Sequence, residues 1–228
     1  MPLDVDVRRQ LRDLLGDGRL ADDARRLWRR TSTLAGKLRA TGRLNNEPDA
    51  DALEIACWAL QLPMRTVDPA QPVGGPGGLV NLRDRCEGAT HQLVDHLGEQ
   101  LPADLLDRTA RLLHETPQRP PVLEEAKLLA DATNLDDFGS VGLLSAVARQ
   151  GSTSTGAGEL ARSFIRRQEY GYWQARLADG FHFTLCRSIA KRRLDNARRL
   201  IDTLLEELAE DGVEDVPRPP GRTPTMGP

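Results

Sequence analysis

Apolar residues recur every three or four positions along much of this 228-residue chain, which is the spacing of one face of an α-helix. Val7, Leu11 and Leu15 show this spacing near the N-terminus, and Leu27 and Leu34 continue it in the next segment. Aromatic residues make up only 4% of the sequence, so Leu and Ala must fill the core, and this composition favours helices over strands. We therefore predict an all-α fold with about seven to nine helices.

Prolines and glycines indicate where the helices are separated. We expect an N-terminal helix and turn over residues 1–19, one helical domain over 20–212, and a disordered proline-rich tail over 213–228. The stretch 65–78 contains three prolines and four glycines and predicts a loop inside the domain. Residues 151–158 are small and polar and predict a flexible connection. A domain of this length can bury a core without disulfides or metal.

The charge of the chain bears on its partners. A formal net charge of -3 is not that of a typical nucleic-acid-binding protein, which carries a strong basic excess. Two arginine-rich segments, 25–30 and 187–199, lie in expected helices and have acidic residues among or beside them. Such runs are typical of solvated helix faces with salt bridges. Nucleic-acid binding through these faces is therefore the less favoured interpretation.

Cysteine usage and the N-terminal residues bear on the location of the protein. Cys57, Cys86 and Cys186 are odd in number and far apart, and they match neither a disulfide framework nor a zinc pattern. We interpret them as reduced thiols. The first residues lack the charged segment and apolar stretch of a signal peptide, and no apolar run is long enough to cross a bilayer. We therefore expect a cytoplasmic protein without a membrane partner.

Five segments, taken in order, carry a more specific pattern. Residues 23–28, Asp-Ala-Arg-Arg-Leu-Trp, resemble an opening helix with the motif His-x-x-Arg-Val-Trp, and residues 53–62 resemble an apolar helix that ends in a His-Asp dyad. Residues 110–114 end in a histidine before a proline-containing turn. Residues 125–139 are similar to the motif Glu-Ala-Lys-Ile-x-x-Asp-Ala-Asp-x-Leu-Asp-x-x-Gly. With Gly-Phe-His-Phe at 180–183 between two closing helices, the set resembles the HD-domain superfamily, in particular its small predicted metal-dependent phosphohydrolases.

The resemblance implies four metal-ligand positions, which are a histidine, a His-Asp dyad and a later aspartate, and their metal activates water and offsets phosphate charge. Here the first position holds Asp23, and the dyad positions hold Leu60 and Gln61. Leucine cannot bind a metal, and a neutral glutamine replaces a carboxylate poorly. The last position holds Thr133, or Asp131 if the motif is read two residues earlier. We therefore expect a degenerate family member with no catalytic residue and no metal site.

Four residues remain as candidates to line the pocket that the resemblance implies. His114 matches the histidine that precedes the proline turn in the family, but it could equally cap the end of its helix. Asp131 could face the pocket or could fix local geometry through hydrogen bonds to the backbone. The full set of pocket candidates is Asp23, Gln61, His114 and Asp131.

These departures favour a non-catalytic protein of the HD type, which binds either a small phosphate-containing ligand or a protein partner and needs no cofactor. The alternative is a divergent metal-dependent phosphohydrolase that acts on nucleotides or other phosphate esters with a weakly bound divalent metal. That alternative requires Asp23, His114 and Asp131, with or without Gln61, to converge on one point. The two hypotheses therefore differ in where these side chains should lie.

Overall fold

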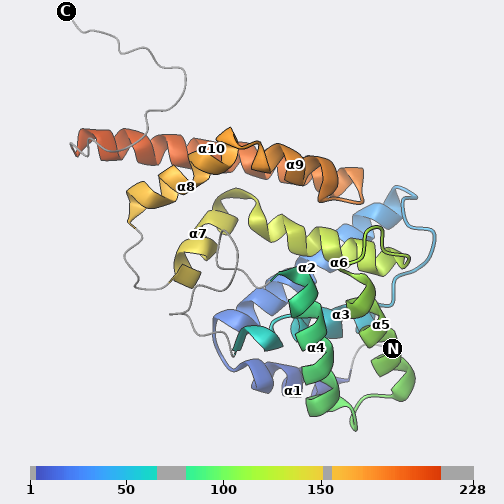
Figure 1. The fold of residues 1–228 in the computed structure, drawn as a ribbon. Coiled ribbons are helices and arrows are strands. Elements are labelled where there is room, and N and C mark those ends of the chain that lie inside the picture. The colour runs from blue at the N-terminus through green and yellow to red at the C-terminus, as the bar shows by residue number, and fades with distance from the viewer. Residues whose placement is uncertain (1–3, 66–80, 151–155, 212–228) are drawn as a thin grey trace, which may run out of the picture.

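The computed structural model describes residues 4–65, 81–150 and 156–211, apart from the side chains of 145–150, and every regular element within these ranges is a helix (Figure 1). The predicted all-α fold is therefore confirmed. The expected tail 213–228, and the expected loop 65–78 apart from Arg65, lie outside the described residues. The α-helices are α1 Val5–Leu15, α2 Arg19–Ala40, α3 Ala50–Ala59, α4 Leu82–Leu97, α5 Ala103–Glu115, α6 Glu124–Asn134, α7 Gly139–Gln150, α8 Ala157–Glu169, α9 Tyr172–Asp179 and α10 Thr184–Glu210, and the 3-10 helices are η1 Leu62–Arg65 and η2 Leu135–Asp137.

Local sequence signals set several helix ends. The side chain of Asp49 accepts a hydrogen bond of 3.0 Å from the backbone N–H of Ala52 and caps the start of α3. The side chain of Asn81 caps α4 in the same way. The segment 158–177, by contrast, predicts one helix but forms parts of two. The reason is that Gly171 adopts a left-handed φ of 68° between α8 and α9, a conformation that ends a right-handed helix.

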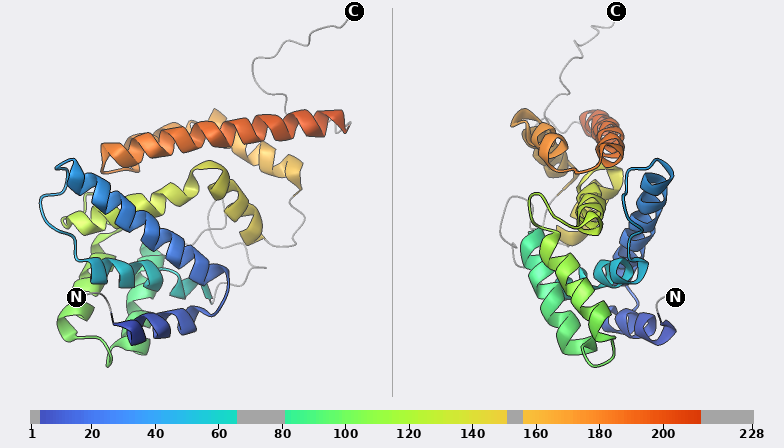
Figure 2. Two further views of the ribbon diagram at one scale, coloured as in Figure 1. Left: turned by 180° about the vertical axis from the view of Figure 1, so that it is seen from behind. Right: turned by 90° about the vertical axis from the view of Figure 1, so that its right-hand side faces the viewer.

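Helix α3 forms the centre of the N-terminal half of the fold. All of its residues from 52 to 59 are buried, as expected of a helix that is apolar on nearly every side. Glu54 is the charged exception, and Arg8 of α1 binds its carboxylate through two hydrogen bonds of 2.7 Å each. Helices α2 and α5 pack against α3, and α1, α4 and α6 also contact it (Figure 2). Burial of each large aliphatic side chain here contributes about 2 kcal/mol to stability.

Helices α8, α9 and α10 form a second layer that lies across the first (Figures 1 and 2). Helix α10 contacts α7, α8, α9 and η2. Aromatic rings join the two layers at the end of η2, where the centroid of the Phe138 ring lies 5.5 Å from that of Trp173 and 5.4 Å from that of Phe181. The short helix η2 therefore lies between the layers, and it carries part of the site described below.

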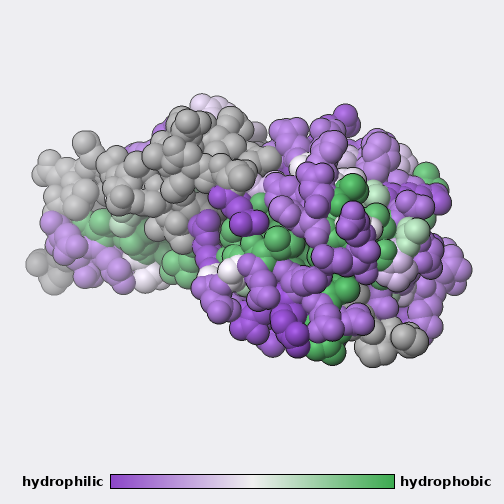
Figure 3. Space-filling model, turned by 90° about the horizontal axis from the view of Figure 1, so that it is seen from below, coloured by the Kyte–Doolittle hydropathy of each residue, from purple (hydrophilic) through white to green (hydrophobic). Residues whose placement is uncertain are grey.

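The outer surface of the described helices is mostly polar. Figure 3 shows one face, on which hydrophilic residues predominate and hydrophobic patches lie between them. The largest exposed apolar side chains are distributed over several helices, with Val94 on α4 and Leu200 on α10 as examples. Among the described residues, no helix combines the length and the apolar character that a membrane span requires.

Candidate functional site

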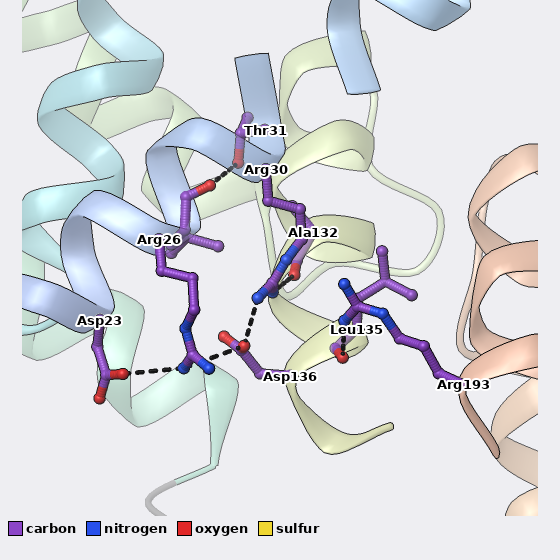
Figure 4. A network of polar contacts seen from close by, with 9 residues as sticks. Asp23, Arg26, Arg30, Thr31, Ala132, Leu135, Asp136 and Arg193 are labelled. Carbon is purple, nitrogen blue, oxygen red and sulfur yellow. Dashed lines mark hydrogen bonds and ion pairs between the residues drawn. The ribbon is translucent and has the colours of Figure 1, made fainter. Parts of the chain in front are cut away.

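Five charged residues from three elements meet between the two helical layers, and we call them the central cluster: Asp23, Arg26, Arg30, Asp136 and Arg193 (Figure 4). The first three lie on α2, Asp136 lies on η2 and Arg193 lies on α10. Nη2 of Arg30 donates to Oδ1 of Asp136 at 2.7 Å, and Nη2 of Arg26 lies 3.4 Å from the same oxygen. Arg26 also pairs with Asp23 at 2.8 Å. Two guanidinium groups therefore share the carboxylate of Asp136.

The central cluster also closes the C-terminal end of α6. The last carbonyl groups of a helix lack partners within the helix, and cations are favoured beside them. Nη1 of Arg30 donates to the carbonyl of Ala132 at 2.6 Å, and Nη1 of Arg193 donates to that of Leu135 at 2.7 Å. The two arginines thus attach α2 and α10 to the end of α6. The prediction that the arginine-rich segments form solvated faces is wrong for Arg30, whose side chain is only 10% exposed.

The positions of the expected dyad lie at the end of α3. Leu60 is fully buried, and the neighbouring Gln61 is 6% exposed. Arg85 of α4 reaches this point, where its Nη2 donates to the carbonyl of Leu60 at 3.3 Å. Its Nε is buried and has no hydrogen-bond partner among the described residues. Arg85 thus brings a positive charge to the positions at which the resemblance implies metal ligands.

The electrostatic surroundings of Arg85 differ from those of the other arginines. Burial lowers the pKa of Arg85, and the nearby carboxylates, Asp136 first, act in the opposite direction. Those carboxylates already pair with other cations, since Arg30 binds Asp136 and Arg176 binds Asp137 at 2.5 Å. No ion pair joins Arg85 to an acidic residue of the described ranges. Sequence reasoning missed this residue, because only the packing of α4 beside α3 reveals its surroundings.

Asp131 is fully buried and serves the start of α10. One carboxylate oxygen accepts the backbone N–H of His182 at 2.8 Å, and the other accepts that of Phe183 at 2.9 Å. These amides lie at the N-terminal end of a helix, where backbone N–H groups lack partners within the helix. Burial raises the pKa of Asp131 to about 6, although both hydrogen bonds favour the ionised form. Of the two interpretations of this residue, the structure shows the hydrogen bonds to the backbone.

Thr133 is the alternative to Asp131 for the last of the implied metal-ligand positions. The residue is 8% exposed, and its Oγ1 is buried without a hydrogen-bond partner among the described residues. A buried hydroxyl without a partner is uncommon, because it has exchanged hydrogen bonds with water for none. Neither register of the motif therefore supplies a free carboxylate at this point.

His114 lies in a different part of the molecule from Asp131 and Thr133. It is exposed near the end of α5 and lines a pocket of about 240 Å³ together with Arg83, Cys86 and His91 of α4. Burial raises the pKa of Cys86 to about 12, so this pocket holds a neutral thiol.

No hydrogen bond or ion pair among the described residues joins any two of the four predicted pocket residues. Asp23 pairs with Arg26, and Asp131 binds backbone amides. The described ranges also contain no group of three or more His, Cys, Asp or Glu residues that could hold a metal ion. The four residues are Asp23, Gln61, His114 and Asp131.

A second pocket borders the ionic contacts, and we call it the α4–α9 pocket. It has a volume of about 240 Å³ and lies between the start of α4, the turn from α5 to α6, and the end of α9. Three arginines line it, Arg83, Arg119 and Arg176, against the single carboxylate of Asp179. Nη2 of Arg176 donates to Asp137, which links the pocket to η2. The α4–α9 pocket is thus the more cationic of the two.

Comparison of this chain with the families of known proteins, with curated proteins and with solved structures found no match.

Proposed function

We propose that this chain is a non-catalytic protein of the HD type that binds a small phosphate-containing ligand. The HD assignment is supported by the ordered set of motifs and by the all-α fold. The main support for the absence of catalysis is that the carboxylates near the implied metal-ligand positions already have partners within the protein. Asp136 is neutralised by Arg30, Asp137 by Arg176, and Asp131 is held by two backbone amides.

This geometry argues against the alternative, a metal-dependent phosphohydrolase. Hydrolysis of that kind needs oxygen and nitrogen ligands that converge on one ion and leave a position open for water. A divalent ion at Asp136 would first have to displace the guanidinium of Arg30, which also caps α6. The ion would thus have to disrupt a contact that holds α2 against α6.

The same geometry favours an anion. The central cluster together with Arg85, Arg176 and Asp137 contains five guanidinium groups and three carboxylates, an excess of two positive charges. A phosphate group carries between about 1.5 and 2 negative charges at pH 7 and offers three acceptor oxygens. Planar guanidinium groups bind such oxygens through paired, charge-assisted hydrogen bonds. Arg85 has no carboxylate in contact, so its charge adds to this local positive excess.

Calorimetric titration of the full chain tests the proposal directly. Inorganic phosphate, AMP and ATP would be titrated at constant ionic strength, and product release would be measured in parallel with added Mg²⁺, Mn²⁺ or Zn²⁺. We expect saturable binding and no hydrolysis, with moderately weaker binding by Arg85→Met, because this change lowers the positive charge beside the cluster. The matched control is Arg29→Met, since Arg29 is exposed on α2.

The unfavourable outcomes are distinct. Metal-dependent hydrolysis that is lost in Asp131→Asn would establish the phosphohydrolase alternative. Absence of binding to all three compounds would refute a phosphate-containing ligand and leave a protein-interaction module as the remaining form of the non-catalytic hypothesis.

A further inference from the structure

The α4–α9 pocket has the size and position of a small subsite. Its volume of about 240 Å³ is below the range of roughly 300–1,000 Å³ that is usual for pockets that hold drug-sized ligands. Its lining comes from four separate parts of the chain, which are the start of α4, the turn before α6, α6 itself and the segment from α9 to α10. The pocket is therefore formed by tertiary packing, and it is large enough for a phosphate group with a small organic part.

The cations of this pocket differ in how far the protein satisfies them. Nη2 of Arg176 donates to Asn134 at 3.2 Å and to Asp137 at 2.5 Å, which fixes the guanidinium, while its Nε is buried without a partner in the described ranges. The side chains of Arg83 and Arg119 are exposed, and within the described part of the chain neither forms an ion pair or a hydrogen bond. One positioned and two free guanidinium groups thus border the same space.

His182 also lines the α4–α9 pocket. Its backbone N–H donates to Asp131, which fixes the residue at the start of α10. Burial, Lys127 and Arg119 all lower the pKa of His182, so the ring is neutral at pH 7. A neutral imidazole can donate one N–H to an anion.

We propose that the α4–α9 pocket binds the phosphate group of the ligand, with Arg83 and Arg119 in direct contact and with Arg176 and His182 as fixed donors. This inference rests on the proposed function and specifies where the phosphate lies. The bound anion would offset the repulsion among the arginines and so explain why the fold keeps three of them around one small cavity.

Nuclear magnetic resonance of the histidine rings locates the site independently of affinity. The chain has four histidines, and His182→Gln assigns the signal of His182. Titration with inorganic phosphate at constant ionic strength should shift the His182 signal and raise the pKa of that ring, because the anion opposes Lys127 and Arg119. Arg83, Arg176 and Asp179 also line this pocket, and Arg187 binds the carbonyl of Phe181 nearby. The signal of His96, which lines a different pocket, should not change.

Affinity measurements on matched variants provide the second test. Arg83→Gln and Arg119→Gln should each weaken phosphate binding about tenfold, the effect expected for one charge-assisted hydrogen bond. Arg29→Gln removes the same charge outside the pocket and should change the affinity by less than about twofold. Wild-type binding that persists in both pocket variants without a shift of His182 would overturn the location and leave the proposed function standing. Failure of the wild-type protein to bind phosphate, AMP or ATP would overturn both.

Discussion

Arg30 and Arg85 approach the same group of carboxylates from two regions of the fold, and the protein treats them differently. Arg30 of α2 uses one guanidinium nitrogen on the carboxylate of Asp136 and another on the carbonyl of Ala132. Arg85 of α4 makes one longer hydrogen bond to the carbonyl of Leu60, and its Nε has no partner among the described residues. One arginine therefore stabilises the fold, whereas the other keeps hydrogen-bonding capacity that the described protein does not use.

The difference teaches how to separate architecture from function in a site rich in arginine. A guanidinium that is paired and also caps a helix is explained by the fold alone. A partly buried guanidinium without a counter-ion lowers stability, and a departure of that kind from the usual rules is most frequent where a ligand binds. Stability measurements on variants test whether Arg30 raises the free energy of unfolding and Arg85 lowers it.

The largest expected effect belongs to Arg30→Met. The change leaves the Asp136 carboxylate without its closest cation and the end of α6 without its cap, so the free energy of unfolding should fall by about 4 kcal/mol. Denaturation by urea measures this quantity. The control is Arg25→Met, which removes an ion pair that is exposed on the surface of α2 and should cost less than about 1 kcal/mol. Similar losses in both variants would show that the central cluster has no special role.

The second effect concerns Asp131. Its carboxylate accepts hydrogen bonds from backbone amides, whereas that of Asp136 pairs with guanidinium groups. Burial raises the pKa of Asp131 from its ordinary 3.8 to about 6, so between these values the folded state binds the proton more tightly than the unfolded chain. The stability that this proton contributes is present below pH 4 and is lost as the pH rises through 6. It amounts to about 3 kcal/mol, because one unit of pKa corresponds to about 1.4 kcal/mol.

Comparison with Asp131→Asn isolates this contribution, since the variant has no proton to lose at position 131. The free energy of unfolding of the wild-type protein, relative to that of the variant, should decrease from pH 4 to pH 6.5 in urea titrations. A constant difference over this range would show that the two amides hold the carboxylate ionised throughout, and that burial does not dominate its pKa.

The third effect should have the opposite sign to the first. Arg85→Met removes a partly buried charge and an unsatisfied Nε while it keeps most of the side-chain volume, so the ligand-free protein should gain about 1–2 kcal/mol. The shift of the urea midpoint measures the gain. Arg83→Met, at an exposed position of the same helix, should leave the midpoint nearly unchanged. A loss of stability in Arg85→Met would make Arg85 a structural residue like Arg30 and would remove the contrast between them.

The sequence predicts the helices of this protein better than it predicts the site. The first helix begins and ends where its apolar spacing and the following glycines place it, at Val5 and Leu15. Helix ends of this kind depend on residues within one turn, so a local pattern contains the information. The break at Gly171 was missed because an isolated glycine is also tolerated inside helices.

The site depends on contacts that no local pattern records. The sequence around Asp136 indicates only a turn or a helix start, yet its partner Arg30 lies 106 positions earlier in the chain. The arginines of α2 share one local pattern, but Arg25 pairs at the surface and Arg30 points into the contact with α6. Only the packing of α2 against η2 distinguishes them. The motif similarly left the register open between Asp131 and Thr133, and the structure shows that the two side chains have different hydrogen-bonding states.

The smallest expected effect tests that difference. Thr133 holds a buried hydroxyl without a partner, so replacement by valine, which has nearly the same shape, should raise the free energy of unfolding by about 1 kcal/mol. Thr31 is the control, because its hydroxyl is also buried but donates to the carbonyl of Leu27 at 2.9 Å and accepts from the thiol of Cys57. Thr31→Val should therefore lower stability by about the same amount.

If Thr133→Val instead destabilises the protein as Thr31→Val does, the hydroxyl of Thr133 must bind an ordered water molecule or another group in solution. Position 133 would then be a polar contact point beside the end of α6. A gain of stability, together with the gain expected for Arg85→Met, would identify two polar groups that the ligand-free fold leaves unsatisfied, one beside the carbonyl of Leu60 and one in α6. The measurement thus extends the contrast between Arg30 and Arg85 from charged groups to a neutral one.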